Sequence, residues 1–307
     1  MPAPAAESPP SSGTRQPLLI DGPPAGVPPL GDSPAASLFP GAGPEGSSGE
    51  FSLFRAGRWL LGRAAAAADE DLPGTVARLY GELLLAIGDL HLCRTWNFVP
   101  DINAPGPGGL ENYRAFSSGR SLAFERHFGR GFKRRLPASS AVGTAGGGIT
   151  VAFAAADAVP RHLENPVQVP AYDYPPQHGP RPPSFSRATV VPEGGRSDVF
   201  IAGTAAIRGH ETMAPGNTGA QLAVTLENLR LISRVTGLGD DLGAGRCAAR
   251  HLRVYLRNAA DLQAVEAMLA RHLLKPGDAV GYFRADICRA ALNVEIEVSV
   301  LGSKVTA

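Results

Sequence analysis

Residues 292–301, LNVEIEVSVL, alternate between apolar and polar side chains along the whole run. The apolar set is Leu292, Val294, Ile296, Val298 and Val300, and the polar set is Asn293, Glu295, Glu297 and Ser299. Successive side chains of a strand point to opposite faces of its sheet, so this period of two predicts a strand with one core face. Two glutamates share the other face. By themselves they fit a solvated edge strand as well as a buried site.

The rest of the C-terminal half alternates between helix-like and strand-like patterns. Apolar side chains recur at spacings of three and four in 219–235 and 259–273, which predicts two helices. Gly237 ends the first of them. The predicted strands are 199–201, 251–256, 278–287 and 292–301. The expected order is therefore strand, helix, strand, helix, strand, strand.

The N-terminal part divides by composition. Residues 1–49 are rich in Pro, Ala, Gly and Ser, and they bury too little apolar surface to offset chain entropy. We expect them to be mostly disordered, although their apolar islands are able to add an edge strand. Residues 50–165 form the expected N-terminal domain, and residues 166–307 form the C-terminal domain.

Within the N-terminal domain, the apolar spacing predicts a helix at 73–90 and a second one at 111–120. Between them, HLCRTWNFVPDIN at 91–103 is interpreted as a rigid loop. Residues 149–153, ITVAF, predict a buried strand.

Composition excludes several classes of protein. The 307 residues carry a formal net charge of +1, which gives no electrostatic case for nucleic acid or an anionic membrane as a partner. Three cysteines, Cys93, Cys247 and Cys288, form no CxxC pair, so neither a disulfide framework nor a structural zinc site is expected. No signal-peptide pattern and no apolar run of membrane-spanning length occurs, so we expect a cytoplasmic protein.

The stretch FIAGTAAIRGHET, residues 200–212, follows a predicted buried strand. Gly203 allows the main chain to approach a ligand closely, and Thr204 adds a hydroxyl group. His210 and Glu211 place a donor and an acceptor in the same stretch. Because no second histidine lies at a metal-ligand spacing from them, we expect no metal site and a hydrogen-bonded, structural His210.

The order of FIAGTAAI, AQLAVTLENL and FRADIC…LNVEIEV resembles that of the RidA (YjgF) family over residues 198–302. The resemblance implies an α+β fold with a RidA/YjgF-like, chorismate mutase-like sheet that is backed by two helices. RidA proteins usually form trimers with clefts between the subunits.

Motifs outside this region narrow the resemblance. The chain is similar to the chorismatases in six segments, namely RTWNFVPDIN (94–103), NYRAFSSGR (112–120), LPASSAVG (136–143), ENPVQVPAYDYP (164–175), PSFSRA (183–188) and GTAAIRGHET (203–212). In that family a divergent N-terminal α/β domain is fused to a RidA-like domain. Stand-alone RidA proteins lack NYRAFSSGR and ENPVQVPAYDYP, so we expect the N-terminal domain of the same chain to complete the cleft.

This resemblance implies an enzyme that cleaves chorismate to 3-hydroxybenzoate and pyruvate without a cofactor. The near alternative is a hydrolase that yields a dihydroxycyclohexadiene carboxylate, and some relatives also form 4-hydroxybenzoate. A RidA-like imine deaminase or metabolite binder is a second alternative, and a purely structural module is a third. The expected partner is chorismate alone, with no nucleic acid and no membrane, in a monomer or a small homo-oligomer.

The resemblance also implies roles for particular residues. Arginine suits the two carboxylates of chorismate because its planar fork makes bidentate bonds, and the candidates are Arg120, Arg187 and Arg284. Glu295 is the expected acid for the methylene carbon of the enol ether, since a confined carboxyl group next to Glu297 stays protonated. Cys288 is the expected second catalytic residue, which directs the ring toward 3-hydroxybenzoate. Further substrate contacts are expected from Tyr113, Tyr172, Gly203, Thr204 and Gln221.

Overall fold

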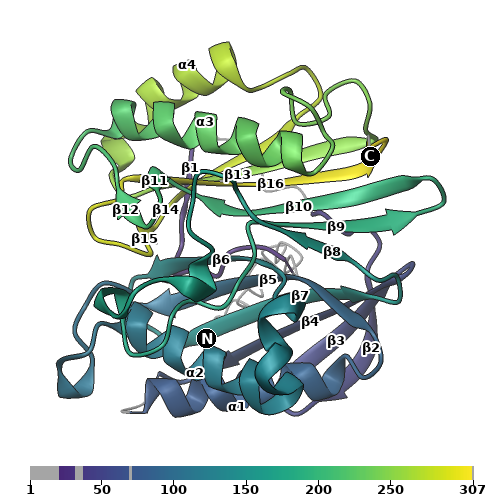
Figure 1. The fold of residues 1–307 in the computed structure, drawn as a ribbon, viewed down its shortest axis with the longest axis vertical. Coiled ribbons are helices and arrows are strands. Elements are labelled where there is room, and N and C mark those ends of the chain that lie inside the picture. The colour runs from purple at the N-terminus through teal and green to yellow at the C-terminus, as the bar shows by residue number, and fades with distance from the viewer. Residues whose placement is uncertain (1–20, 32–36, 69–70, 306–307) are drawn as a thin grey trace, which may run out of the picture.

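Two seven-stranded sheets lie face to face, and each is covered on its outer side by two helices (Figure 1). The computed structural model describes residues 21–31, 37–68 and 71–305. In Figure 1 the C-terminal sheet lies under helices α3 and α4, and the N-terminal sheet lies above helices α1 and α2. The molecule is thus a stack of four layers in the order helix, sheet, sheet, helix.

The N-terminal sheet has the strand order β15-β6-β5-β7-β4-β3-β2. Its strands are β2 (Gly43–Ser48), β3 (Phe51–Ala56), β4 (Trp59–Ala66), β5 (His91–Pro100), β6 (Ala138–Thr144), β7 (Ile149–Ala156) and β15 (Asp286–Ile287). Helices α1 (Leu72–Ala86) and α2 (Asn112–Phe128) cover it. Strand β5 therefore replaces the rigid loop that was predicted at 91–103. Nine of its ten side chains are buried, because the strand lies in the middle of the sheet.

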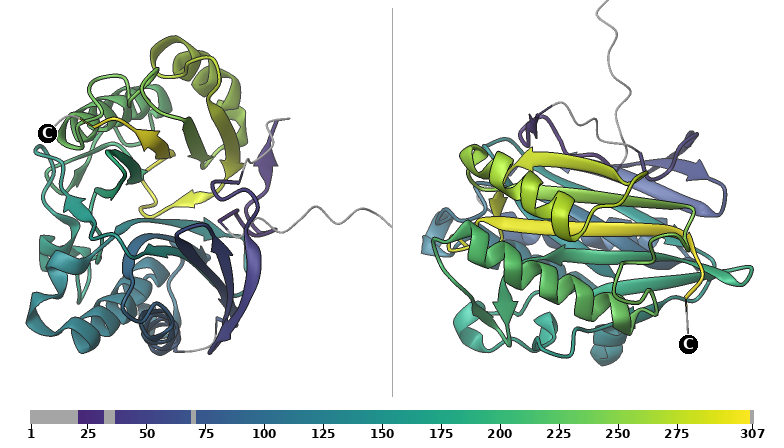
Figure 2. Two further views of the ribbon diagram at one scale, coloured as in Figure 1. Left: turned by 90° about the vertical axis from the view of Figure 1, so that its right-hand side faces the viewer. Right: turned by 90° about the horizontal axis from the view of Figure 1, so that it is seen from above.

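The C-terminal sheet has the strand order β1-β14-β13-β16-β10-β9-β8. Its strands are β1 (Pro29–Leu30), β8 (Arg161–Leu163), β9 (Ala188–Glu193), β10 (Arg196–Thr204), β13 (Ala249–Leu256), β14 (Ala279–Arg284) and β16 (Val294–Ser303). Helices α3 (Thr218–Val235) and α4 (Leu262–His272) cross it on the outer side (Figure 2). The short strands β11 (Ile207–Arg208) and β12 (Glu211–Thr212) form a separate hairpin.

The two halves share one topology. Along the chain, the elements β3-β4-α1-β5-α2-β6-β7 follow one another in the same order as β9-β10-α3-β13-α4-β14-β16. Within the sheets, the strand order β6-β5-β7-β4-β3 corresponds to β14-β13-β16-β10-β9. In each half a single pair of strands is parallel, β5 with β6 and β13 with β14, and a helix forms the crossover. The N-terminal half is thus a divergent repeat of the C-terminal half, which the sequence patterns did not reveal.

Strand β16 shows why the alternation in the sequence matters. Val294, Ile296, Val298 and Val300 belong to the core beneath α3 and α4. The glutamates between them face the other sheet and are buried, so the interpretation as a solvated edge strand is wrong. Leu292 precedes the strand and packs in the core between the sheets, so it does not share the face of the other apolar residues.

Two further expectations differ from the structure. The predicted strand at 278–287 is broken at Ala285, and its end crosses to the other sheet as β15, where it pairs with β6. Residues 43–48 form β2, although the segment 1–49 was expected to be mostly disordered. This strand consists of Gly, Ser, Glu and one Pro, and it joins the sheet through backbone pairing with β3. Residues 1–20 and 32–36 lie outside the described residues, and the domain boundaries stay a prediction.

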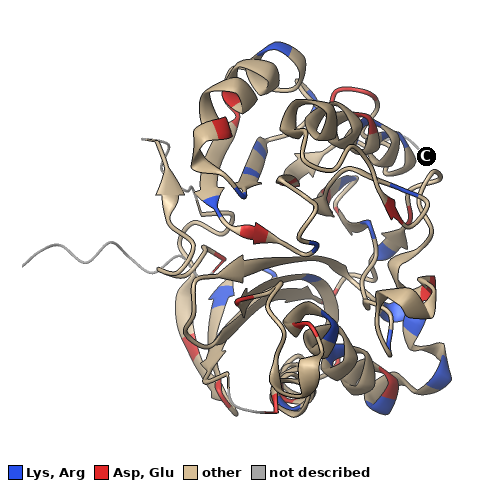
Figure 3. Ribbon diagram, turned by 90° about the vertical axis from the view of Figure 1, so that its left-hand side faces the viewer, with Lys and Arg blue, Asp and Glu red and all other residues tan. Residues whose placement is uncertain are grey.

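In the part of the chain that the structure describes, no helix is long and apolar enough to cross a membrane. Positive and negative residues are interspersed over the ribbon rather than separated onto single-sign faces (Figure 3).

Candidate active site

A cavity of about 330 Å³ opens between the two halves of the chain. Helix α2 and strand β6 supply one wall, and strand β10, the segment around Arg187 and the turn before β16 supply the other. Six of the ten predicted site residues line it, namely Tyr113, Arg120, Arg187, Gly203, Cys288 and Glu295. Both halves contribute, as expected for a cleft that the N-terminal domain completes.

Glu295 points from β16 into this cavity and is only 2% exposed. Its Oε1 atom accepts no hydrogen bond from the described residues. Burial, assisted by the negative charge of Glu297, raises the pKa of the Glu295 carboxyl group to about 8. Arg94 and Arg187 oppose this shift without cancelling it. Glu295 is thus a protonated carboxylic acid near neutral pH, with an oxygen free for a ligand.

Gly203 makes room for this acid. Its position on β10 brings the main chain so close to Glu295 that a Cβ atom at residue 203 would overlap the carboxyl group. The Gly203 N–H donates to Ser140 Oγ at 3.1 Å, which joins β10 to β6 across the two sheets. A residue without a side chain is therefore required here by the packing of Glu295.

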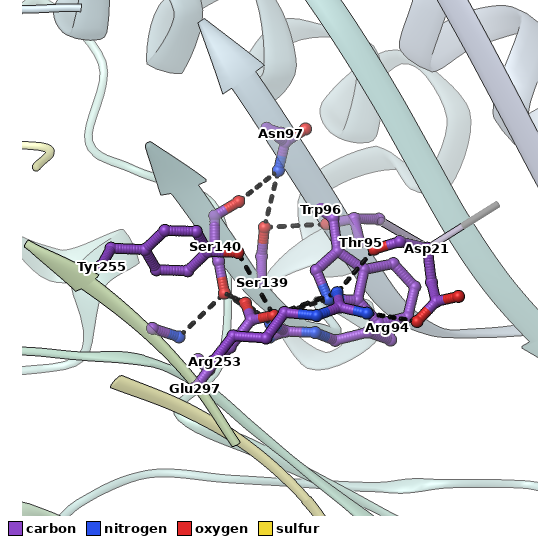
Figure 4. A network of polar contacts seen from close by, with 12 residues as sticks. Asp21, Arg94, Thr95, Trp96, Asn97, Ser139, Ser140, Arg253, Tyr255 and Glu297 are labelled. Atoms are coloured by element: carbon purple, nitrogen blue, oxygen red, sulfur yellow. Dashed lines mark hydrogen bonds and ion pairs between the residues drawn. The ribbon is translucent and has the colours of Figure 1, made fainter. Parts of the chain in front are cut away.

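Glu297 is the centre of a buried network that lies behind the cavity (Figure 4). Its Oε2 accepts from Arg94 Nη2 at 2.6 Å and from the Ser140 hydroxyl, and its Oε1 lies 3.3 Å from Arg253 Nη1. Trp96 Nε1 also donates to Oε1, at 3.2 Å. Two arginines and several neutral donors thus hold one carboxylate, as buried charges require.

Asp21 completes the charge balance of this network. Arg253 Nη1 donates to the Asp21 carbonyl oxygen at 2.5 Å, and Arg253 Nη2 pairs with the Asp21 carboxylate. Two buried arginines, Arg94 and Arg253, are therefore matched by two buried carboxylates, Asp21 and Glu297. A residue of the N-terminal segment is thus part of the support for the site.

Arg120 projects from α2 into the cavity and is 1% exposed. Its Nη1 donates to Ser139 Oγ at 3.0 Å, and its guanidinium group lies 4.7 Å from the ring of Phe116. Its Nε and Nη2 have no hydrogen-bond partner among the described residues. A buried guanidinium group with unused donors is suited to an anionic ligand.

Arg187 shares an aromatic contact with Arg120, since the guanidinium groups lie 5.0 Å and 5.8 Å from the centroid of the Phe185 ring. Arg187 Nη2 donates to the Tyr174 hydroxyl at 2.8 Å. Arg187 Nε lies 4.0 Å from Glu164 Oε2. The cavity therefore contains two fixed guanidinium groups that both contact one aromatic ring.

Cys288 and Arg289 follow β15 and line the cavity beside Glu295. Burial, with the nearby Glu295, raises the pKa of the Cys288 thiol to about 12. The side chain is thus a neutral thiol rather than a thiolate. Arg289 Nη1 donates to the His210 carbonyl oxygen at 2.8 Å, which fixes the turn between β11 and β12.

Tyr113 lines the cavity from the first turn of α2 and stacks on Phe116 with ring centroids 6.4 Å apart. Burial is the main cause that raises the pKa of its hydroxyl group, so the hydroxyl stays protonated.

Four predicted site residues do not line the cavity. Arg284 pairs with Asp286 at 3.3 Å, because the chain leaves the C-terminal sheet directly after it. Tyr172 packs against the core under the N-terminal helices, and Tyr174 takes the position in the cavity instead. The Thr204 hydroxyl donates to the Ala202 carbonyl of its own strand at 2.8 Å.

Gln221 is the fourth of these residues, and its role is structural. Its Nε2 donates to the Ala291 carbonyl at 2.7 Å, and its Oε1 accepts from the Asn293 N–H at 2.7 Å. The side chain therefore holds the turn from which β16 carries Glu295 into the cavity.

Sequence reasoning missed several residues that line the cavity. They include Ser139, Ser140, Tyr174, His178, Phe185 and Arg289. Arg289 and Tyr174 stand next to or within motifs that supported the family resemblance, and this adjacency was the available signal. The two serines stand within LPASSAVG at 136–143, another motif of the resemblance, but only the facing of the two sheets brings Ser140 to Glu297.

His210 does not line the cavity but lies at its rim. His178 Nε2 lies 3.1 Å from His210 Nδ1, although 32 residues separate them in the sequence. Sequence spacing did not indicate this second histidine, because only the fold brings residues 178 and 210 together.

Comparison with known proteins agrees with this architecture. A family model described as chorismatase FkbO/Hyg5-like, N-terminal, matches residues 40–155. A Streptomyces hygroscopicus protein named 3-hydroxybenzoate synthase is 39% identical over 224 residues, which are 70% of this chain and 65% of that protein. A chorismatase of Streptomyces rapamycinicus is 41% identical over 233 residues, which are 73% of this chain and 69% of that protein. This chain thus spans about two thirds of the length of these relatives.

Among solved structures, the crystal structure of a chorismatase at 1.08 Å resolution matches with a TM-score of 0.75 and 32% identity. The match covers 84% of this chain and 78% of that one, so both halves of the fold are included. The predicted α+β class, with sheets backed by helices, is confirmed. Sequence identity, coverage and fold therefore agree that the chain belongs to the chorismatase family.

Proposed function

We propose that the protein cleaves chorismate to 3-hydroxybenzoate and pyruvate. The observation that carries this proposal is the protonated, buried Glu295 in a cavity that also holds Arg120 and Arg187. The name of the Streptomyces hygroscopicus relative, 3-hydroxybenzoate synthase, supports the choice of product. The two products together contain the atoms of one chorismate, so the reaction consumes no other substrate.

The two carboxylates of chorismate fit the two arginines. Arg120 and Arg187 are both buried, and the nitrogens without a hydrogen bond to the described residues are Nε and Nη2 of Arg120 and Nε of Arg187. A carboxylate is able to accept from both free nitrogens of Arg120 and from the free nitrogen of Arg187. Phe185, which contacts both guanidinium groups, offers an apolar face to the ring of the substrate. Binding by these groups orients the enol ether toward Glu295.

Glu295 donates its proton to the methylene carbon of the enolpyruvyl group. The electron pair of the C=C bond forms the new C–H bond, and the positive charge develops on the ether carbon, where the ether oxygen shares it. The resulting Glu295 carboxylate stabilises that charge at short range. Glu297 keeps Glu295 protonated in the resting enzyme because a second negative charge beside it is unfavourable.

In this proposal Cys288 determines which product is formed from the ring, the diene diol or 3-hydroxybenzoate. Capture of the oxocarbenium ion by water gives a hemiketal, which collapses to pyruvate and the diene diol. Formation of 3-hydroxybenzoate instead uses no water. The bond between the ring carbon and the ether oxygen breaks, its electron pair completes the keto group of pyruvate, and the oxygen of the neighbouring ring hydroxyl bonds to that ring carbon and returns a proton to the Glu295 carboxylate. This oxygen then leaves its original ring carbon and is protonated, while the carbon that now carries it loses its C–H proton, which makes the ring aromatic. Cys288 acts there as a neutral, polarisable thiol, in accordance with its raised pKa.

Chromatography of the products from purified protein and chorismate tests the proposal. We expect 3-hydroxybenzoate and pyruvate in equal amounts. For Cys288→Ala, pyruvate release should continue while the organic product shifts toward the diene diol. If the wild type forms only the diene diol, the protein is a chorismate hydrolase. If it releases no pyruvate, the proposed function is wrong. An unchanged fraction of 3-hydroxybenzoate from Cys288→Ala removes the cysteine from the mechanism.

A further inference from the structure

Three side chains with metal-ligating atoms meet at the rim of the cavity. They are His178, His210 and Glu211, and their ligand atoms all lie within 4.8 Å of one another. His178 follows Pro175 and Pro176 in a short 3-10 turn, and the other two residues belong to the β11–β12 hairpin. The proposed cleavage of chorismate uses none of the three.

The spacing of these atoms is close to that of ligands around one cation. His178 Nε2 lies 3.1 Å from His210 Nδ1, which in turn lies 2.9 Å from Glu211 Oε1. Neighbouring ligands of tetrahedral Zn²⁺ are separated by roughly 3.3–3.4 Å when each bond is about 2.0–2.1 Å long, so small side-chain rotations bring the three ligand atoms to these separations. Two imidazoles and one carboxylate are also a donor set that divalent transition metals prefer. A cation would replace the hydrogen bond between the rings, with the shared proton on another ring nitrogen.

The surroundings hold the two imidazole rings in place. The Tyr174 ring packs against both imidazoles, with centroid distances of 5.0 Å to His178 and 6.3 Å to His210. The hairpin main chain is fixed on both sides of His210. Gly209 exchanges backbone hydrogen bonds with the segment at 167–169, and Arg289 binds the His210 carbonyl. Rings that are already oriented lose little freedom when a cation binds.

We propose that His178, His210 and Glu211 form a binding site for one divalent transition-metal cation, such as Zn²⁺, at the rim of the cavity. The three protein ligands leave at least one coordination position for water or an anionic ligand. Arg289 and Arg114 line the adjacent wall of the cavity, and their positive charges lower the affinity, so the site is weaker than a closed structural zinc site. The proposal replaces the expectation from the sequence that the chain has no metal site.

The test uses metal-free protein without a histidine tag and measures the binding of Zn²⁺ alone by isothermal titration calorimetry. Titration with Co²⁺, followed by visible absorption, reports the nitrogen and oxygen ligands independently. The wild type should bind about one cation per chain, as expected for a single three-ligand site. His178→Ala, His210→Ala and Glu211→Gln should each weaken binding at least ~10-fold, because each removes one ligand. The matched control is His272→Ala, an exposed histidine of α4, which should bind as the wild type does.

The outcome distinguishes binding of the cation at one three-ligand site from nonspecific binding by surface histidines. If the His178→Ala and His210→Ala variants, shown by circular dichroism to be folded, bind Zn²⁺ as tightly as the wild type, the proposal is overturned. The same conclusion follows if the wild type binds no cation, or if His272→Ala weakens binding as much as the ligand variants do. None of these readouts requires catalytic activity, so they do not depend on the proposed function.

Discussion

Replacement of Glu295 by glutamine tests the acid directly. Glutamine has nearly the same size and still fits beside Gly203, but its amide protons are far too weakly acidic to be donated to a carbon atom. General acid catalysis contributes a factor of roughly 10²–10⁴, so turnover by Glu295→Gln should fall by about that amount. The variant should fold, because the Oε1 atom of Glu295 accepts no hydrogen bond from the described residues.

The raised pKa of Glu295 determines how much of this side chain is protonated at neutral pH. With a pKa of about 8 instead of the ordinary 4.5, Glu295 is ~90% protonated at pH 7 rather than ~0.3%. Burial and the charge of Glu297 thus increase the protonated fraction of Glu295 about 300-fold at this pH. Since the protonated form is the active one, kcat/KM should be level below pH 8 and fall about tenfold per pH unit above it.

The same burial predicts a stability effect of known sign. The folded state retains a proton on Glu295 that the unfolded chain releases, so wild-type stability is lost as the pH rises from about 4.5 to about 8. The total loss amounts to at most about 5 kcal/mol. Glu295→Gln carries no such proton. Its free energy of unfolding, measured with denaturant, should therefore rise relative to that of the wild type as the pH increases.

The assay for activity couples pyruvate release to lactate dehydrogenase and records initial rates from about pH 6 to about pH 10, the range that brackets the expected pKa. Glu193→Gln is the matched control, since Glu193 is a mostly exposed glutamate at the end of β9. Glu295 is not the general acid if folded Glu295→Gln keeps turnover close to that of the wild type. The same conclusion follows if wild-type kcat/KM rises through pH 8.

Three further predictions concern the surroundings of this acid. Arg187→Lys removes the planar fork and should raise KM for chorismate ~10-fold or more with a smaller change in kcat; steady-state kinetics that show an unchanged KM would exclude Arg187 as a carboxylate anchor. Gly203→Ala places a Cβ atom against the Glu295 carboxyl group, so kcat should fall at least ~10-fold, whereas Gly81→Ala in α1, where a Cβ atom meets nothing within 4 Å, serves as the glycine control for the fold. Asp21→Asn leaves Arg253 without the Asp21 carboxylate, so the free energy of unfolding should fall by about 3–5 kcal/mol. Denaturant titration measures this change, and a loss below ~1 kcal/mol would mean that Asp21 contributes little to the network.

Most elements of the C-terminal half follow from local sequence patterns. The apolar periods in 219–235 and 251–256 correspond to α3 and β13 within two residues at each end. Such elements follow from local pattern, because one apolar face per element is enough to define their period. Glu295, Cys288, Arg120 and Arg187 were also named from the sequence, through motifs that resemble those of a known family, and all four line the cavity.

The contacts of the polar face of β16 depend on the tertiary structure and do not follow from the local pattern. The alternation placed Glu295 and Glu297 on one face, but it did not distinguish solvent from a second sheet. Packing of the two repeats face to face buries both glutamates, which gives Glu297 its arginine partners and leaves Glu295 protonated. The same packing brings Asp21 to Arg253 and His178 to His210, over sequence separations of 232 and 32 residues. Contacts of this kind depend on how distant elements pack, and no local period or propensity records them.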